Sequence, residues 1–315
     1  MGARLVPSLL ERNYEVIAVD TFWYGEEVLP NRDNSSLKLL KIDIRNKNAL
    51  CDAMKGITDV IHLACISNDP SFDLNPNLGK SINLDAFEPL VQIAKNAGVR
   101  RFIYASSSSV YGVKNEERVT EELSLEPLTD YSKYKAICEE ILLGYQTEDF
   151  VCTVLRPATV CGWSPRQRFD LSVNILTNHA VNNGQIKVFG GTQYRPNIHI
   201  EDMVDAYLLT LNAPEKSVNS QVFNVGSDNL TINQIAEEVS RNTGIEKVVH
   251  ENTDDLRSYR IDSSKIAKAL GFQFRRNVGS AVIDLVKAFN ENRFQDSMNN
   301  SLYFNIKRMK ELAIH

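Results

Sequence analysis

The sequence lacks the residue spacings that mark a metal site or a disulfide framework. Among its 315 residues only five are cysteines, an odd number with no Cys-x-x-Cys pair: Cys51, Cys65, Cys138, Cys152 and Cys161. Such cysteines are typical of reduced thiols in a cytosolic protein, so we predict a cytoplasmic location. The five histidines are dispersed without the spacing of zinc ligands, and no metal is expected.

Long apolar runs and basic stripes are also missing. No apolar run approaches the roughly 20 residues that a membrane-spanning helix needs. The formal net charge is −5, and the lysines and arginines do not gather in a stripe, which disfavours nucleic-acid binding. With 43% hydrophobic residues the chain can still build a large core. We therefore expect a protein that acts on a small molecule and has no nucleic-acid or membrane partner.

The most informative stretch begins with a strand that ends in four serines. Residues 102–105 are apolar and aromatic and predict a buried strand, and residues 106–109 are all serine. Further along, Thr129 or Asp130 can cap a helix in which Tyr131 and Lys135 are four residues apart and share one face. A hydroxyl, a phenol and an ammonium group can thus meet at the carboxyl end of a sheet, where ligands of open α/β folds bind.

These side-chain types suit proton transfer to and from an alcohol. A phenol titrates near pH ~10, and a neighbouring ammonium favours the phenolate and lowers that value. Tyrosine then becomes a usable acid and base, and a serine beside it can hold the reacting oxygen in line. Tyr303 and Lys307 have the same spacing, but no strand ending in serines precedes them, so we interpret that pair as an exposed helix face.

The segments SSSSVYG at 106–112 and YSKYK at 131–135 resemble the extended short-chain dehydrogenase/reductase superfamily, in its nucleotide-sugar epimerase/dehydratase branch. The resemblance covers nearly the whole chain. It implies NAD as the cofactor, a nucleotide sugar as the substrate and a homodimer as the assembly. It assigns catalysis to Ser107, Tyr131 and Lys135, and the lysine also holds the nicotinamide ribose.

The expected fold is α/β, a Rossmann-like doubly wound parallel sheet with a smaller C-terminal α/β substrate lobe. Residues 1–165 are expected to bind NAD, and residues 166–315 to form mainly the substrate lobe, with strands that return to the first domain. The beginning is unusual because residues 1–10 read as a helix, whereas this fold needs a strand and a glycine-rich turn first. We therefore expect a sheet that lacks its first strand and glycine-rich turn.

Other elements follow from hydrophobic periodicity. We predict strands at 14–19, 37–42, 59–64, 151–155 and 221–226, and helices at 81–97, 231–243, 280–290 and 301–315.

An acidic residue at the end of the second strand points to the form of the cofactor. Asp20 can accept both hydroxyls of the adenosine ribose and would repel a 2′-phosphate, which favours NAD over NADP. The resemblance adds further cofactor-binding positions, namely Gly2, Asp43, Ile44, Leu63, Ala64, Cys65, Asn83 and Pro157, besides Tyr131 and Lys135. His62 is interpreted as a core histidine.

Substrate contacts are expected from polar residues that follow the strands. The resemblance implies substrate-binding roles for Ser67, Ser108, Thr159, Arg166, Arg168, Arg195 and Arg257. Relatives often carry asparagine in place of Thr159, which puts that contact in question. Arg166 and Arg168 offer guanidinium groups for a diphosphate, with a solvated loop as the equal alternative.

The reaction type follows from the two residues before Val110. Dehydratases of the family carry Asp-Glu there and the related decarboxylase a glutamate, whereas this chain has Ser108 and Ser109. Epimerisation needs only oxidation, rotation of the ketosugar and return of the hydride, so we expect an NAD-dependent nucleotide-sugar epimerase. A C4 dehydrogenase or reductase on the same triad is the alternative, and a non-catalytic dinucleotide sensor is a third reading.

Overall fold

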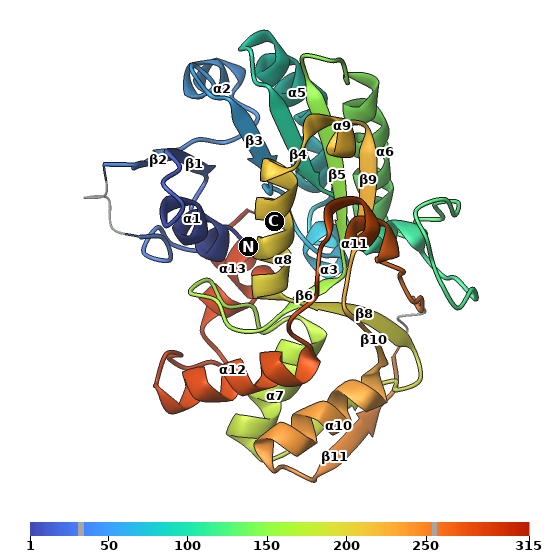
Figure 1. The fold of residues 1–315 in the computed structure, drawn as a ribbon. Helices are drawn as coiled ribbons and strands as arrows, with labels where there is room; N and C mark the ends of the chain where they lie inside the picture. The colour runs from blue at the N-terminus through green and yellow to red at the C-terminus, as the bar shows by residue number, and fades with distance from the viewer. Residues whose placement is uncertain (31–34, 254–256, 315) are drawn as a thin grey trace.

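The computed structural model describes residues 1–30, 35–253 and 257–314 (Figure 1). Its central sheet has four parallel strands in the order β3-β4-β5-β9. These strands are Asp59–His62 (β3), Arg101–Ala105 (β4), Val151–Pro157 (β5) and Gln221–Val225 (β9). β4 and β5 are buried along almost their whole length, as expected for parallel strands covered on both faces.

Helices cover both faces of this sheet. One layer contains α2 (Lys47–Ala53), α5 (Phe87–Asn96) and α6 (Asp130–Gly144), and the other contains α1 (Gly2–Leu10), α8 (Ile200–Asn212) and α11 (Ser264–Leu270). Successive side chains of a strand point to opposite faces. Accordingly Phe102 and Tyr104 of β4 pack in the first layer, and Ile103 between them packs in the second. The predicted doubly wound α/β fold is confirmed.

The sheet is divided next to β3. The strands β1 (Val16–Asp20) and β2 (Leu37–Lys41) form a separate parallel pair, which stands apart from β3 in Figure 1. Within residues 1–30, 35–253 and 257–314 no strand joins β1 to β3. The space between them is lined by apolar side chains of α1, β1 and β3, including Leu5, Leu9 and Ile61. This division agrees with the prediction of a sheet without its first strand.

A smaller lobe lies below the sheet in Figure 1. Its core joins α7 (Ser172–Asn183), α10 (Ile232–Thr243) and α12 (Val278–Asn290), beside the parallel strands β7 (Ile186–Phe189) and β11 (Val248–Glu251). A three-stranded sheet, β10-β8-β6, connects it to the rest of the chain. These strands are Asp228–Thr231 (β10), Tyr194–His199 (β8) and Thr159–Cys161 (β6). The domain boundary after residue 165 stays a prediction. β9 follows that boundary in the sequence and returns to pair with β5.

Shorter elements surround the sheet. They are the helices α3 (Asp69–Asp73), α4 (Pro76–Lys80), α9 (Glu215–Val218) and α13 (Asn305–Glu311), a π-helical turn η1 (Ser81–Asp85), and the 3-10 turns η2 (Ser108–Tyr111) and η3 (Ser301–Tyr303). No helix in the described part of the chain has both the length and the apolar character needed to cross a membrane.

Two helix predictions are corrected. The helix expected over 81–97 begins as the π-helical turn η1, and α5 starts only at Phe87. The helix expected over 301–315 is split, because Phe304 has an extended backbone between η3 and α13. His315, at the end of that prediction, lies outside the described residues.

Candidate active site

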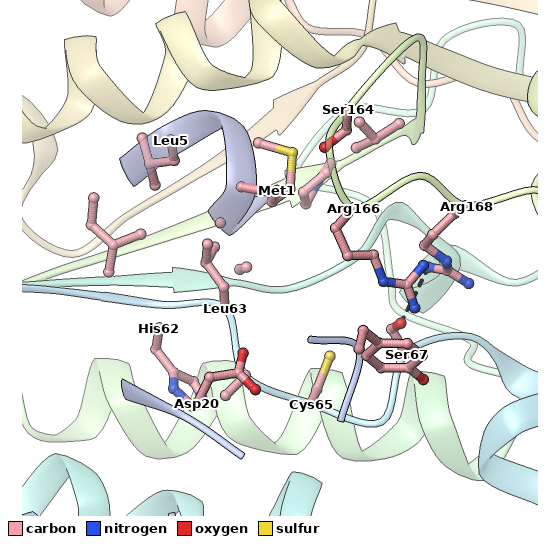
Figure 2. A pocket seen from close by; sticks show the side chains of 18 of the residues that line it. Met1, Leu5, Asp20, His62, Leu63, Cys65, Ser67, Ser164, Arg166 and Arg168 are labelled. Atoms are coloured by element: carbon pink, nitrogen blue, oxygen red, sulfur yellow. Dashed lines mark hydrogen bonds between the residues drawn. The ribbon is translucent and has the colours of Figure 1, made fainter. Parts of the chain in front are cut away.

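A cavity of about 1380 Å³ opens at the carboxyl ends of β1, β3 and β4 and extends to the smaller lobe. Its walls include the amino end of α1, the loops after β1 and β3, the four-serine turn and the start of α6. Figure 2 shows one region, in which Arg166 and Arg168 reach toward Ser67 and Cys65 on the loop after β3. Parallel strands place such loops at one edge of a sheet, which explains why residues far apart in sequence converge here.

The three proposed catalytic residues are brought together by β4 and α6. Ser107 follows β4 in an extended conformation and begins the turn η2, and Thr129 caps α6 in a reciprocal capping box with Ser132. On α6 the ammonium of Lys135 lies 5.9 Å from the centre of the Tyr131 ring. Lys135 Nζ also donates to the carbonyl oxygen of Ala105 at 2.6 Å, which ties the helix to the end of the strand.

The surroundings of Tyr131, above all its burial, favour the protonated phenol. Burial raises the pKa of Tyr131, and the nearby Cys65 and Asp69 raise it further, while Arg168 and a hydrogen bond with Ser107 lower it. Burial outweighs the positive charge, so the net direction is opposite to the lowering expected from Lys135 alone.

The four serines have different partners. The hydroxyls of Ser107 and Ser109 are 2.8 Å apart, and the Ser109 amide donates to Ser107 Oγ at 3.1 Å. Ser108 lies 3.2 Å from the hydroxyl of Tyr259, which also lines the cavity. The turn closes at Gly112, where φ is +70° and an added Cβ would lie 2.1 Å from the Glu126 carbonyl oxygen, so only glycine fits.

A buried ion pair supports this turn from behind. The Ser106 hydroxyl donates to the carboxylate of Glu139, and Arg156 binds the same carboxylate through Nε and Nη2, with Nη2 2.6 Å from Oε2. The side chains of Glu139 and Arg156 are 4% and 6% exposed. Arg156 Nη1 also donates to the hydroxyl of Tyr111 at 2.7 Å. The network fixes α6, β5 and the serine turn relative to one another.

Most of the residues predicted for a dinucleotide line the same cavity. Gly2, Asp20, Asp43, Ile44, Leu63, Ala64, Cys65 and Pro157 all line it. Asp20 ends β1 and accepts a hydrogen bond from the Phe22 amide at 2.8 Å. The amino end of the nine-residue helix α1 also lines the cavity, and helix amino ends attract phosphate groups. These features suit a dinucleotide, with Asp20 at the ribose and α1 at the pyrophosphate.

Two of the predicted cofactor residues, Asp43 and Asn83, form side-chain hydrogen bonds with other residues of the protein. Asp43 is bound by the guanidinium of Arg45 at 2.6 Å, and this hydrogen bond lowers the pKa of Asp43. Asn83 is buried and does not line the cavity. Its side chain accepts from the Ile66 amide and donates to the Ile66 carbonyl, both at 2.9 Å. Asn83 therefore shapes the loop after β3 from behind.

The four predicted arginines all line the cavity, and they are held in two pairs. Arg166 stacks on Tyr24, with its guanidinium carbon 3.7 Å from the ring centre, and donates to Asn305 at 2.6 Å. Burial, with a smaller contribution from Arg168, lowers the pKa of Arg166 to about 10. Arg168 binds Asp170 at 2.9 Å and Ser67 at 3.2 Å, and its Nη2 atom is buried without a hydrogen-bond partner in the described structure. This pair is thus held by defined contacts, unlike a solvated loop.

The second pair, Arg195 and Arg257, lines the same cavity. Arg195 of β8 donates to the carbonyl oxygen of Arg257, and Arg257 forms an ion pair with Asp69. Thr159 of β6 also lines the cavity. The sequence DDLRSYR gave the prediction for Arg257, but residues 254–256 of that segment lie outside the described residues.

The structure agrees with the interpretation of His62 as a core histidine and contradicts the interpretation of Tyr303 and Lys307 as an exposed helix face. His62 is 9% exposed and lies among the rings of Phe87, Phe102 and Tyr104. The interpretation of Tyr303 and Lys307 as one exposed helix face was wrong. Tyr303 ends the 3-10 turn η3 and packs with Phe169 and Phe294, whereas Lys307 lies in α13 and donates to the carbonyl oxygen of Met298.

Sequence reasoning missed several residues that shape the cavity. Asp69, Tyr24, Tyr259 and Asn305 all line it. Asn305 of α13 binds Ser67, which is 238 positions earlier in the chain. A local sequence pattern cannot predict a contact between residues so far apart in the chain. The family resemblance places Asp69, with Ser67, in a loop that faces the substrate, but it assigned no role to the Asp69 carboxylate.

Within the described residues no three histidine, cysteine or carboxylate side chains are grouped in a way that could hold a metal ion.

Comparison with known proteins gives the family. The family model described as NAD dependent epimerase/dehydratase family matches residues 1–226. A UDP-glucose 4-epimerase of Lactobacillus helveticus is 25% identical over 87% of this chain and 88% of its own. A UDP-N-acetyl-alpha-D-glucosaminuronate decarboxylase of Bacillus cytotoxicus is 26% identical over 79% of each chain. The structure of MoeE5 in complex with UDP-glucuronic acid and NAD has a TM-score of 0.81 and 27% identity, and covers 92% of this chain and 96% of that one. The chain belongs to the NAD-dependent epimerase/dehydratase family.

Proposed function

We propose that the protein is an NAD-dependent epimerase of a nucleotide-activated sugar, which acts through a transient ketosugar. The observation that carries the proposal is the site at the end of β4. Ser107, Tyr131 and Lys135 meet there, while the two positions after Ser107 hold buried serines. Elimination of water would need an added acid and base. The side chains of Ser108 and Ser109 cannot supply them near neutral pH.

The chain's own residues account for the proton transfer. Tyr131 removes the proton from a sugar hydroxyl, and Ser107 holds the same oxygen by a hydrogen bond. Lys135 contributes positive charge 5.9 Å from the phenol ring and is fixed by the carbonyl oxygen of Ala105. Bound NAD supplies the hydride acceptor and returns the hydride. Rotation of the ketosugar between the two transfers inverts the carbon.

The charge of the cavity supports a diphosphate-bearing substrate. Four arginines line it, Arg166, Arg168, Arg195 and Arg257. Guanidinium groups bind phosphate oxygens through charge-assisted, often bidentate hydrogen bonds. Arg168 has a buried Nη2 atom without a hydrogen-bond partner in the described structure, and a bound anion would satisfy it. The epimerase from Lactobacillus helveticus and the MoeE5 complex support a uridine diphosphate sugar as the first substrate to test.

The experiment incubates the purified protein with UDP-glucose or UDP-glucuronic acid, with and without added NAD, and resolves the products by NMR. An epimeric sugar nucleotide without net change in NADH is the expected result. A ketosugar that accumulates with stoichiometric NADH would instead identify the dehydrogenase alternative. If no nucleotide sugar is converted while NAD still binds, the dinucleotide-sensor reading replaces both.

We also propose a homodimer and a cytoplasmic location. The first is expected from the family resemblance and the second from the unpaired cysteines, three of which are buried. Light scattering at several protein concentrations tests the dimer.

A further inference from the structure

One buried carboxylate in the cavity wall has two long-range partners. Asp69 lies in the first turn of α3 and is 8% exposed. Its Oδ1 atom accepts a hydrogen bond from the hydroxyl of Thr129, and its Oδ2 atom accepts from Nη1 of Arg257. Asp69 thus joins segments that are 60 and 188 positions away in the chain.

Each of these two partners is itself connected to the proposed chemistry. Thr129 is the N-cap of α6, the helix that carries Tyr131 two residues later. Arg257 is one of the arginines proposed for the diphosphate, and its carbonyl oxygen accepts a hydrogen bond from Arg195. A displacement of Asp69 would therefore disturb both the amino end of α6 and the position of Arg257.

Asp69 also contributes negative charge at the phenol. After burial, Cys65 and Asp69 raise the pKa of Tyr131, and Arg168 lowers it. Lys135 faces the same ring from within α6. Removal of the Asp69 charge therefore shifts the balance at Tyr131 toward the phenolate.

We propose that Asp69 is a positioning residue, which holds the Arg257 guanidinium ready for the diphosphate of the substrate and anchors the amino end of α6. The inference rests on the proposed function in that it takes the ligand to be a nucleoside diphosphate. A guanidinium carries five N–H donors in one plane, so it can bind a carboxylate along one edge and a phosphate along another. The side chain is then ordered before the ligand arrives, which reduces the entropy cost of binding.

Asp69→Asn is the informative change. It keeps one acceptor oxygen for Thr129 but removes the charge and the second acceptor that Arg257 uses. Because ordering a flexible side chain costs about 0.5–1.5 kcal/mol, affinity for UDP should fall roughly two- to twelvefold. In the pH profile of kcat, the limb that reports deprotonation of Tyr131 should move to lower pH.

The matched control is Asp73→Asn, which removes the same charge from the exposed end of the same helix. UDP titrations by calorimetry are compared for the parent protein, both variants, Arg257→Ala and the double variant of Asp69 and Arg257. We expect Asp73→Asn to match the parent protein, and Asp69→Asn to have no further effect on UDP affinity once Arg257 is alanine. Binding of UDP to Asp69→Asn as tightly as to the parent, or more tightly, would overturn the proposal.

The remaining outcomes also separate the possibilities. If the Tyr131 limb of the kcat–pH profile does not move in Asp69→Asn, the charge of Asp69 does not act on Tyr131. If Asp69→Asn does not fold, Asp69→Glu moves the carboxylate while keeping its charge, and it should weaken UDP binding with the pH limb unchanged. Unaltered UDP affinity in that variant would overturn the inference. UDP binding needs no turnover, so failure of the proposed epimerase activity would be seen separately.

Discussion

The buried pair of Glu139 and Arg156 gives a quantitative prediction for stability. Glu139→Ala removes a carboxylate that accepts from Ser106 and from two nitrogens of Arg156, at distances from Arg156 of 2.6–3.2 Å. The guanidinium, 6% exposed, would keep only the hydroxyl of Tyr111 as a side-chain partner among these contacts. Removing one partner of a buried ion pair costs about 3–5 kcal/mol because the other charge is left uncompensated.

The assay is urea unfolding followed by tryptophan fluorescence and by circular dichroism. Asp52→Ala is the control, since Asp52 and Lys55 form an exposed pair whose side chains are 75% and 76% exposed, and its unfolding midpoint should not change measurably. A loss of less than about 1 kcal/mol in Glu139→Ala, the size typical of surface pairs, would refute the reasoning.

A double variant separates charge from packing. Glu139→Leu combined with Arg156→Met fills similar space with apolar groups and leaves no buried charge. It should be more stable than Glu139→Ala, because buried pairs replaced together by apolar residues often cost little. Its activity should still fall, since Ser106 loses the acceptor that helps to fix the serine turn. Full activity in the double variant would show that the network serves stability alone.

Three further predictions concern the cleft and the core. Tyr131→Phe should lower turnover roughly 10²–10⁴-fold by removing the acid and base, whereas Tyr303→Phe should be near neutral; equal losses in steady-state assays would contradict the assignment. Alanine at Arg195 or Arg257 should mainly raise KM for a nucleotide sugar, and an equal loss of activity on an uncharged sugar would argue against diphosphate binding. Burial, aided by Lys135, lowers the pKa of His62 to about 3. The stability that depends on neutral His62 is complete above pH ~6.5 and is lost as the pH falls toward 3, by up to roughly 4–5 kcal/mol. His62→Phe should flatten this part of the stability–pH curve, and an unchanged curve in urea titrations would refute it.

Local sequence signals were reliable where a single segment contains both the pattern and its physical cause. A helix cap at Thr129 or Asp130 and the four-residue spacing of Tyr131 and Lys135 lie within one helix, so the sequence predicted both, and the structure places the cap at Thr129. The helix expected over 301–315 was wrong because its break depends on packing. Phe304 is extended, and Met309 beyond it is buried against α3 and its neighbours. Tertiary contacts override helix propensity in such a segment.

By itself the sequence determined the parallel α/β fold, the divided sheet and the grouping of Ser107, Tyr131 and Lys135. Hydrophobic periodicity, helix caps and the ends of strands are properties of short segments. Parallel strands also bring their carboxyl ends to one edge of the sheet. Only the tertiary structure decided that Asp69 binds Arg257, and that burial raises the pKa of the Tyr131 phenol. Long-range pairing and desolvation depend on which segments pack together, and no spacing within one segment contains that information.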